Sequence, residues 1–267
     1  MKTIIAATDF SPSSVNACRY AAFLAEKLQC KLTLFNLFEA PIIHSNVGLY
    51  GITYSSQKTS SHQKTKKLME QLQKQFPKIK IDYFTTFGGM KAEVENFTKA
   101  HQVEAAVMGL AAKDKISKFL YGSTGVNIAG KIECPVIIVP SNYKTHRLSK
   151  VLLTVDNSEK LQRSSLSDFR KFILHAKSRV KILHVRTEDE FPSSAMNTIK
   201  ITDKNQSIET INAKDIQSGV RKFCALESID LVSIISKKHS AFYNLFFESN
   251  TKKVAFAAKV PVMAIHS

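Results

Sequence analysis

An internal repeat constrains this chain more than any other feature of its sequence. The apolar segment 2–9 is echoed by the segment 150–156, and both end in aspartate. The apolar segment 134–139 is echoed by 260–265, and each carries a proline in its second position. A length of 267 residues suits two domains that each bury a core of their own. The chain is therefore expected to contain two copies of one fold.

Strand-like and helix-like segments alternate along both copies. The expected strands of the first copy are 2–8, 31–38, 79–87, 103–109 and 135–139, and its helices are 15–28, 63–75, 91–101 and 124–131. The expected strands of the second copy are 151–155, 179–185, 207–212, 231–235 and 262–265, and its helices are 164–176, 214–227 and 250–259. This alternation indicates βαβ units and a mainly parallel sheet.

The expected fold class is therefore α/β, with two Rossmann-like or flavodoxin-like domains. The first domain covers 1–142, the second and degenerate domain covers 149–267, and a polar linker occupies 141–149. Residues 40–62 are rich in Ser, Gly, Tyr and His without a clear period, so a long loop is expected there. Residues 187–206 are polar where the first copy has a loop and a helix, so that helix is expected to be shortened or missing.

Composition places the chain among soluble globular proteins. It is 44% hydrophobic and 22% charged, and no apolar run approaches the roughly 18–20 residues that span a bilayer. Asp9 and Ser11 interrupt the first apolar stretch too early for a signal peptide, and the same pattern recurs at 150. The expected location is the cytoplasm, with no membrane association.

The chain is basic, with a formal net charge of +16. There are 18 basic and 10 acidic residues before residue 145, and 20 and 12 after it, so neither half concentrates the charge. The lysines of 64–80 alternate with apolar residues at helical spacing, which is typical of a solvated helix face. The charge favours anionic partners in general. The absence of arginine clusters and of interleaved aromatic residues argues against nucleic acid as the partner.

The segment 105–125 carries the pattern that points to a ligand. A parallel sheet binds ligands at the carboxyl ends of its strands, and Gly109 ends one of them. Gly122, Ser123 and Thr124 then open a helix, whose unpaired N–H groups and positive dipole end suit an anion. The alternative interpretation is that Ser123 only caps the helix and Gly109 only makes a turn. The local pattern alone leaves both open.

This arrangement resembles the universal stress proteins in tandem-domain form, over nearly the whole chain and best over 1–40 and 103–140. Nucleotide-binding members share a glycine motif, G-x-x-G, nine residues, then G-S or G-T. This chain has Gly109, then Ala112 in place of the second glycine, nine residues, and then Gly122 and Ser123. The spacing of the motif is kept, and one glycine is replaced.

The resemblance implies that the first domain binds ATP or a related adenine nucleotide, with Mg²⁺ as a candidate companion ion. It implies nine nucleotide-binding positions: Gly109, Ala112, Gly122, Ser123 and Thr124 around the phosphates, Asp9 on the adenine or ribose side, Ala7 and Leu37 beside the base, and Met108 under the ribose. If position 112 requires a positive φ or a close backbone contact, its alanine costs about 1 kcal/mol. Lys113 and Lys115 could compensate electrostatically, or serve as solvated loop charges.

Asp9 has two interpretations, because an aspartate between a strand and Ser-Pro also caps the following helix. Its repeat at Asp156, in a copy without the glycines, favours a structural share in its role. In the second copy, an offset of 126 between the shared prolines puts Glu248 where the first copy has Gly122. A carboxylate there competes with a phosphate for the same N–H groups, so the second copy is not expected to bind a nucleotide.

No sequence pattern indicates an enzyme, so at most a slow ATP hydrolysis is expected. The cysteines, Cys18, Cys30, Cys134 and Cys224, lie far apart, which favours reduced core thiols over disulfides or a zinc site. His44 and His62 are the two histidines expected near the site, with exposure to solvent as the simpler interpretation.

The sequence leaves two hypotheses for function. The chain is either a cytoplasmic regulator of the stress response that binds an adenine nucleotide, or a nucleotide-free interaction protein. Pairing through the short strands 136–139 and 262–265 is expected to join the two copies as an internal pseudo-dimer, and a homodimer of the whole chain is left open.

Overall fold

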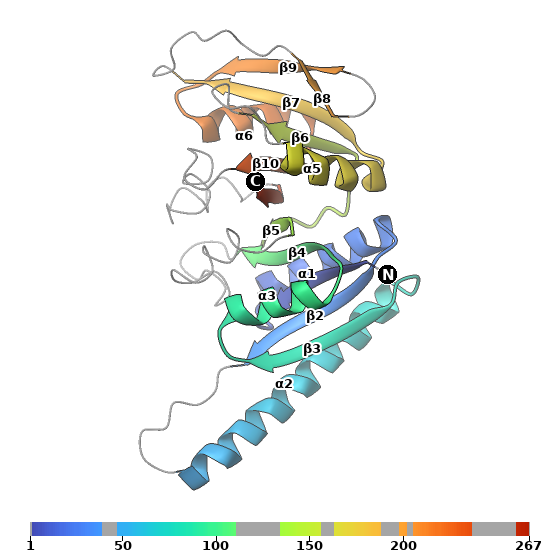
Figure 1. Ribbon diagram of the computed structural model, residues 1–267, viewed down its shortest axis with the longest axis vertical. Coiled ribbons are helices and arrows are strands. Elements are labelled where there is room, and N and C mark those ends of the chain that lie inside the picture. Colours follow the sequence, from blue (N-terminus) through green and yellow to red (C-terminus); the bar gives the residue numbers. More distant parts are fainter. Residues whose placement is uncertain are drawn as a thin grey trace. The chain divides into compact units, whose positions relative to one another are not determined.

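The structure is a computed structural model of the chain (Figure 1). It describes residues 2–38, 47–110, 134–155, 163–187, 198–201, 205–236 and 260–266. The chain divides into two compact units, Met1–Ser141 and Asn142–Ser267. The expected helices at 124–131 and 250–259 lie outside the described residues. No helix that the structure describes is long and apolar enough to cross a membrane.

The first unit is built on a parallel sheet. Its strands are β1 (Thr3–Thr8), β2 (Lys31–Phe38), β3 (Ile81–Phe87), β4 (Val103–Leu110) and β5 (Val136–Pro140). They lie in the order β3-β2-β1-β4-β5, and every pairing among them is parallel. The chain starts in the middle of the sheet, moves outward through β2 and β3, and then returns to the other side of β1. The direction of strand addition therefore reverses between β1 and β4.

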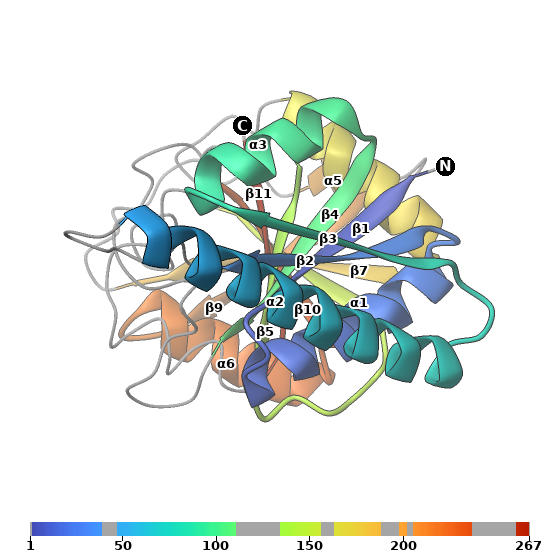
Figure 2. The ribbon, with the colours of Figure 1, turned by 90° about the horizontal axis from the view of Figure 1, so that it is seen from below.

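Helices cover both faces of this sheet. Figure 2 shows α1 (Pro12–Lys27) and α2 (Val47–Gln75) on one face and α3 (Met90–Ala100) on the other. Helix α1 begins where Ser11 caps it, because the Ser11 side chain accepts a hydrogen bond from the Ser14 N–H and Pro12 fits the first turn. The opposite face is filled by aromatic rings, with Phe35 of β2 edge-on to Phe97 of α3 at 5.7 Å between centroids.

Helix α2 corrects the sequence prediction. A loop was expected over 40–62, but a single helix runs from Val47 to Gln75. Its inward stripe is Tyr54, Gln57, Ser61, Thr65, Leu68 and Leu72. The residues of the amino-terminal part of this stripe are polar or aromatic, so no apolar period shows in the sequence. Ser61 and Thr65 are buried all the same, because hydrogen bonds satisfy their polar groups. The Thr65 hydroxyl donates to the Ser61 carbonyl at 2.7 Å.

The second unit repeats the sheet of the first. Its strands are β6 (Lys150–Thr154), β7 (Arg179–Arg186), β8 (Thr198–Lys200), β9 (Asn205–Asn212), β10 (Leu231–Ser236) and β11 (Val262–His266). The five parallel strands lie in the order β11-β10-β6-β7-β9, which is the order of the first unit. Helices α5 (Arg163–Ala176) and α6 (Ile216–Glu227) pack on it. The repeated sequence thus corresponds to a repeated topology, and the α/β fold class is confirmed.

The two units differ between their second and third parallel strands. In the first unit α2 fills this connection. In the second unit, the described residues between β7 and β9 form the short strand β8, which pairs antiparallel with β9 through Ile199 opposite Gln206. The shortened connection follows the polar composition of 187–206, which offers no apolar stripe to bury.

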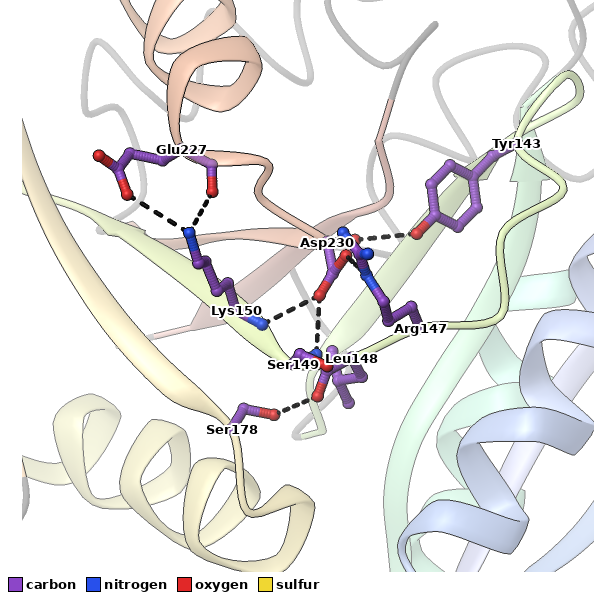
Figure 3. Close-up of polar contacts among 8 residues, drawn as sticks. All are labelled: Tyr143, Arg147, Leu148, Ser149, Lys150, Ser178, Glu227 and Asp230. Carbon is purple, nitrogen blue, oxygen red and sulfur yellow. Dashed lines mark hydrogen bonds and ion pairs between the residues drawn. The ribbon is translucent and has the colours of Figure 1, made fainter.

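Of the expected linker 141–149, all residues after Ser141 belong to the second unit, where they are fixed by a buried aspartate. Asp230 is 3% exposed and lies just before β10. Its carboxylate accepts hydrogen bonds from the Ser149 N–H at 2.7 Å, the Lys150 N–H at 3.0 Å and the Arg147 Nε at 2.7 Å (Figure 3). Three donors meet most of the hydrogen-bonding demand of a buried carboxylate. The segment before β6 is therefore anchored to the unit.

Tyr143 adds to the same anchor. Its hydroxyl donates to the Asp230 carbonyl at 3.4 Å (Figure 3). Burial, together with the nearby Asp230 charge, raises the pKa of Tyr143 to about 12. The phenol is therefore neutral and able to donate at any physiological pH.

Candidate functional site

The candidate site lies at the carboxyl edge of the first unit's sheet. Strands β1 and β4 are parallel neighbours, with Ala6 opposite Val107, so Asp9 and Gly109 come to the same edge. The strand order reverses between these two strands. In open α/β sheets such a reversal separates the two following connections and leaves a crevice at the carboxyl ends, where ligands bind. The structure therefore brings two of the predicted site residues to the place where this topology offers room.

Gly109 has a packing reason for being a glycine. A Cβ atom at this position would lie 2.4 Å from the Ser13 carbonyl oxygen and 2.8 Å from the Ser14 nitrogen. The first turn of α1 therefore rests directly on the backbone of β4, and any side chain would push it away. The sequence prediction gave Gly109 its role because a missing Cβ admits a phosphate. On the side where the Cβ would point, the structure has α1 instead.

The turn after β1 is held by its own side chains. The Thr8 hydroxyl accepts from the Phe10 N–H at 3.1 Å, and the Asp9 carboxylate accepts from the Ser11 N–H at 3.0 Å. Phe10 has a φ of +64°, which is rare for a bulky residue and costs of the order of 1 kcal/mol. Asp9 thus has the structural role that its repeat at 156 suggested. A contact of Asp9 with a nucleotide stays a prediction.

Asn36 is a residue of this edge that the sequence analysis missed. It is 2% exposed, and its Nδ2 donates to the Thr8 carbonyl at 2.8 Å. Its Oδ1 accepts from the Ser61 hydroxyl of α2. One amide therefore joins the ends of β1 and β2 to the long helix. The signal was a lone asparagine in the apolar run 31–38, where an unpartnered amide would be costly to bury.

Asn16 makes a similar tie on the other side of β1. Its Nδ2 donates to the Pro140 carbonyl at 3.1 Å, joining α1 to the end of β5. Asn16 and Asn36 together fix the strand ends on both sides of β1. A rigid frame at this edge is what a binding site needs if its geometry is to be set before the ligand arrives.

The remaining predicted site residues divide into two groups. Ala7 and Met108 are 5% and 2% exposed, so both side chains are core residues of the unit, whereas Leu37 is partly exposed. The others lie outside the described residues: Ala112, Gly122, Ser123 and Thr124, together with the lysines at 113 and 115 and His44. Their assignment to the phosphates stays a prediction.

The second unit repeats the tie at the end of its first strand with a different residue type. His184 of β7 is buried, and its Nδ1 lies 3.3 Å from the Val155 carbonyl oxygen. Because a carbonyl oxygen can only accept, Nδ1 carries the hydrogen in this contact. The imidazole takes the place that the Asn36 amide has in the first unit. Asp156 and Glu248 lie outside the described residues, so the expected loss of the second site stays a prediction.

Cys18, Cys30 and Cys134 are buried core thiols, as predicted, and Cys224 is half-buried. Burial raises the pKa of Cys18, Cys134 and Cys224 to about 12 and that of Cys30 to about 11. All four are free of disulfides and fully protonated at neutral pH. Within the described ranges, no group of three or more His, Cys, Asp or Glu side chains is arranged to hold a metal ion. His62, expected in a loop, lies on α2 with its ring 5.9 Å from that of Tyr83.

These features define the class of the protein. Each unit is an open parallel α/β sheet with the strand order 3-2-1-4-5 of a doubly wound, Rossmann-like sheet. In the first unit, hydrogen-bonded side chains fix the carboxyl edge at the strand reversal. The model of the universal stress protein family matches residues 1–140. The chain belongs to the universal stress protein family, which confirms the resemblance seen in the sequence.

Solved structures support the fold of the whole chain. A universal stress protein from Archaeoglobus fulgidus DSM 4304 has a TM-score of 0.64 at 15% identity, over 98% of this chain and 97% of that chain. A functionally unknown protein from Pseudomonas aeruginosa PAO1 has a TM-score of 0.52 at 10% identity, over 100% of this chain and 92% of that chain. At these identities the likeness concerns the fold alone. No curated protein matches the sequence at a significant level.

Proposed function

We propose that the chain is a cytoplasmic regulatory protein of the stress response that binds ATP or a related adenine nucleotide through its first unit. The observation that carries the proposal is the meeting of Asp9 and Gly109 at the strand reversal, followed by the spaced Gly122-Ser123 pair. The carboxyl edge supplies the place, and the predicted helix start at Gly122 supplies N–H groups for the phosphates.

The family supports a regulatory role and not catalysis. The described polar residues at the edge are aspartate, serine, threonine and asparagine, and they form hydrogen bonds with each other and with the backbone. No described group there combines a nucleophile with a base in the way that hydrolysis requires. We therefore assign the site to binding, with hydrolysis of ATP slow at most and Mg²⁺ entering only with the nucleotide.

A nucleotide-free interaction protein is the second candidate, and one observation favours it. Gly109 is explained by the approach of α1, so its presence alone is not a signature of phosphate binding. Ala112 also replaces the second glycine of the family motif. Both observations make the motif of this chain a weaker indication of nucleotide binding.

A direct measurement separates the two candidates. Protein purified without added nucleotide is heat-denatured, and the supernatant is analysed for adenine nucleotide by absorbance and chromatography. Binding of ATP and of adenosine to the emptied protein is then followed by calorimetry. Saturable binding of ATP with one site per chain supports the proposal. No binding at millimolar ATP, in protein whose circular dichroism is that of a folded α/β protein, supports the interaction protein.

A further inference from the structure

Helix α2 and the turn that follows it carry a dense set of positive charges, here called the α2 lysines. At 29 residues it is about 43 Å long, given a rise of about 1.5 Å per residue. Seven lysines fall between Val47 and the start of β3, and all seven are exposed: Lys58, Lys64, Lys66, Lys67, Lys74, Lys78 and Lys80. Glu70 is the one acidic residue in 47–80. This segment therefore carries most of the excess charge of the first half of the chain.

These lysines differ from others in how they are neutralised. Lys2 pairs with Glu104 at 2.7 Å, Lys171 with Asp168 at 3.1 Å and Lys181 with Glu209 at 2.9 Å. In the part of the chain that the structure describes, none of the seven α2 lysines has such an ion pair. Lys64 instead has its ammonium 6.0 Å from the centre of the Phe10 ring. The charge of the α2 lysines is thus compensated by solvent and counterions, with no ion pair to a carboxylate among the described residues.

Three of the α2 lysines face away from the sheet. The side of α2 that carries Leu68 and Leu72 is buried against the sheet. Lys66, Lys67 and Lys74 lie on the opposite side of the helix, which faces away from the sheet. The other exposed residues of that side are hydroxyl and amide side chains, among them Ser56, Thr59, Gln63 and Gln71. Between Tyr54 and Gln75, the outer side of α2 therefore combines cations and the single carboxylate of Glu70 with neutral hydrogen-bonding groups, and it shows no large apolar residue.

We propose that the outer side of α2 binds the sugar–phosphate backbone of double-stranded nucleic acid without sequence preference. Lysine, serine, threonine and glutamine are the side chains that contact phosphates. A duplex carries one negative charge per about 1.7 Å, so unneutralised lysines spread along a long helix gain binding free energy when they release its counterions. The lack of arginine clusters and aromatic platforms, which argued against nucleic acid in the sequence, excludes base reading and single-strand stacking, and leaves backbone contacts.

Two other kinds of partner fit the surface less well. Protein interfaces are depleted in lysine and enriched in aromatic residues and arginine, which the outer side lacks between Tyr54 and Gln75. An interfacial helix inserts its apolar face into a membrane, but the apolar residues Leu68 and Leu72 of α2 are already buried on the sheet.

The test compares two triple variants of the full chain. Lys66, Lys67 and Lys74 are changed to Gln in one, and the exposed Lys144, Lys214 and Lys222 of the second unit in the other. Both lose three charges, and Gln keeps the helix propensity of Lys. Binding to a fluorescein-labelled DNA duplex of mixed sequence is followed by anisotropy between about 50 and 200 mM salt. Phosphatidylserine vesicles serve as a second probe.

We expect the wild type to bind the duplex with a strong salt dependence. The α2 variant should lose affinity at least tenfold at the lowest salt, and its log–log salt slope should fall by about 0.9 for each lysine that contacts a phosphate. The control variant should bind like the wild type. Absence of duplex binding by the wild type, an equal loss in both variants, or α2-dependent binding to vesicles but not to the duplex would each overturn the proposal.

Discussion

The Cβ atom that Gly109 lacks would lie 2.4 Å from the carbonyl oxygen of Ser13, so helix α1 and strand β4 touch through their backbones. The contact sets how deeply the first turn of α1 sits against the sheet, and with it the position of Asp9 and Phe10. Packing and the candidate site therefore share a residue, and a change at 109 affects both.

Gly109→Ala should destabilise the first unit by about 1–3 kcal/mol, because the methyl group displaces the start of α1. Urea unfolding measures the change. Gly89→Ala is the matched control, since a Cβ there would have nothing within 4 Å. Equal losses in the two variants would mean that α1 does not rest on Gly109.

Asn36→Ala should cost about 1–3 kcal/mol, because it leaves the Thr8 carbonyl and the Ser61 hydroxyl buried without their partner. Asn36→His copies the solution of the second unit, where His184 meets Val155, and should recover part of the loss. A double-mutant cycle with Ser61→Ala should show coupling above about 0.5 kcal/mol. Strict additivity would contradict the amide tie.

The nucleotide prediction is tested at two positions of the motif. Gly122→Glu copies Glu248 of the second copy and should abolish ATP binding without changing the unfolding temperature of the protein. Ala112→Gly should strengthen binding if the missing glycine is a defect. If the wild type binds ATP and neither change alters the dissociation constant in calorimetry, the nucleotide binds elsewhere.

Alkaline pH should destabilise the protein through its buried thiols. Burial raises the pKa of Cys18 from 9.0 to about 12, so above pH 9 the unfolded chain releases a proton that the folded chain retains. The stabilisation of the folded chain by the protonated Cys18 thiol is complete below pH 9, and it is lost as the pH rises toward 12. Urea unfolding at pH 8 and pH 10.5 should show this fall, and Cys18→Ala should reduce it. An unchanged pH dependence in that variant would rule out the thiol as a source.

Asp230→Ala should loosen the segment that precedes β6, because Ser149, Lys150 and Arg147 lose their shared acceptor. Trypsin should then cleave faster after Lys144 and Arg147, as seen by mass spectrometry of early fragments. Arg147→Ala should have a smaller effect on cleavage after Lys144, since its side chain is more than half exposed. Identical fragments and rates in Asp230→Ala and the wild type would contradict the anchor.

Sequence reasoning succeeded where burial alone decides the structure. Strands such as β1 and β4 are mainly apolar runs in a parallel sheet, and the repeat shows the same alternation of strands and helices in both copies. It failed at α2, whose inward positions Ser61 and Thr65 are buried by hydrogen bonds and leave no apolar period. Asn36 was also missed, because its structural role depends on hydrogen-bond partners that lie 28 and 25 residues away in the sequence.

Gly109 shows a different limit. The sequence marked it correctly as a position that tolerates no side chain, but two physical causes give the same glycine. Close approach of a phosphate and close approach of a helix are indistinguishable until the neighbouring backbone is placed.

The antiparallel strand β8 has a consequence for how the chain resists aggregation. Among the described strands, β8 forms one edge of the second unit's strand order with three residues, and β3 forms one edge of the first unit's with seven. A three-residue edge offers little backbone for another chain to pair with, whereas β3 also exposes Phe84 and Phe87, at 37% and 47%. Of these two edges, β3 is therefore the one that favours unwanted strand addition, and it lies in the unit that also carries the candidate nucleotide site.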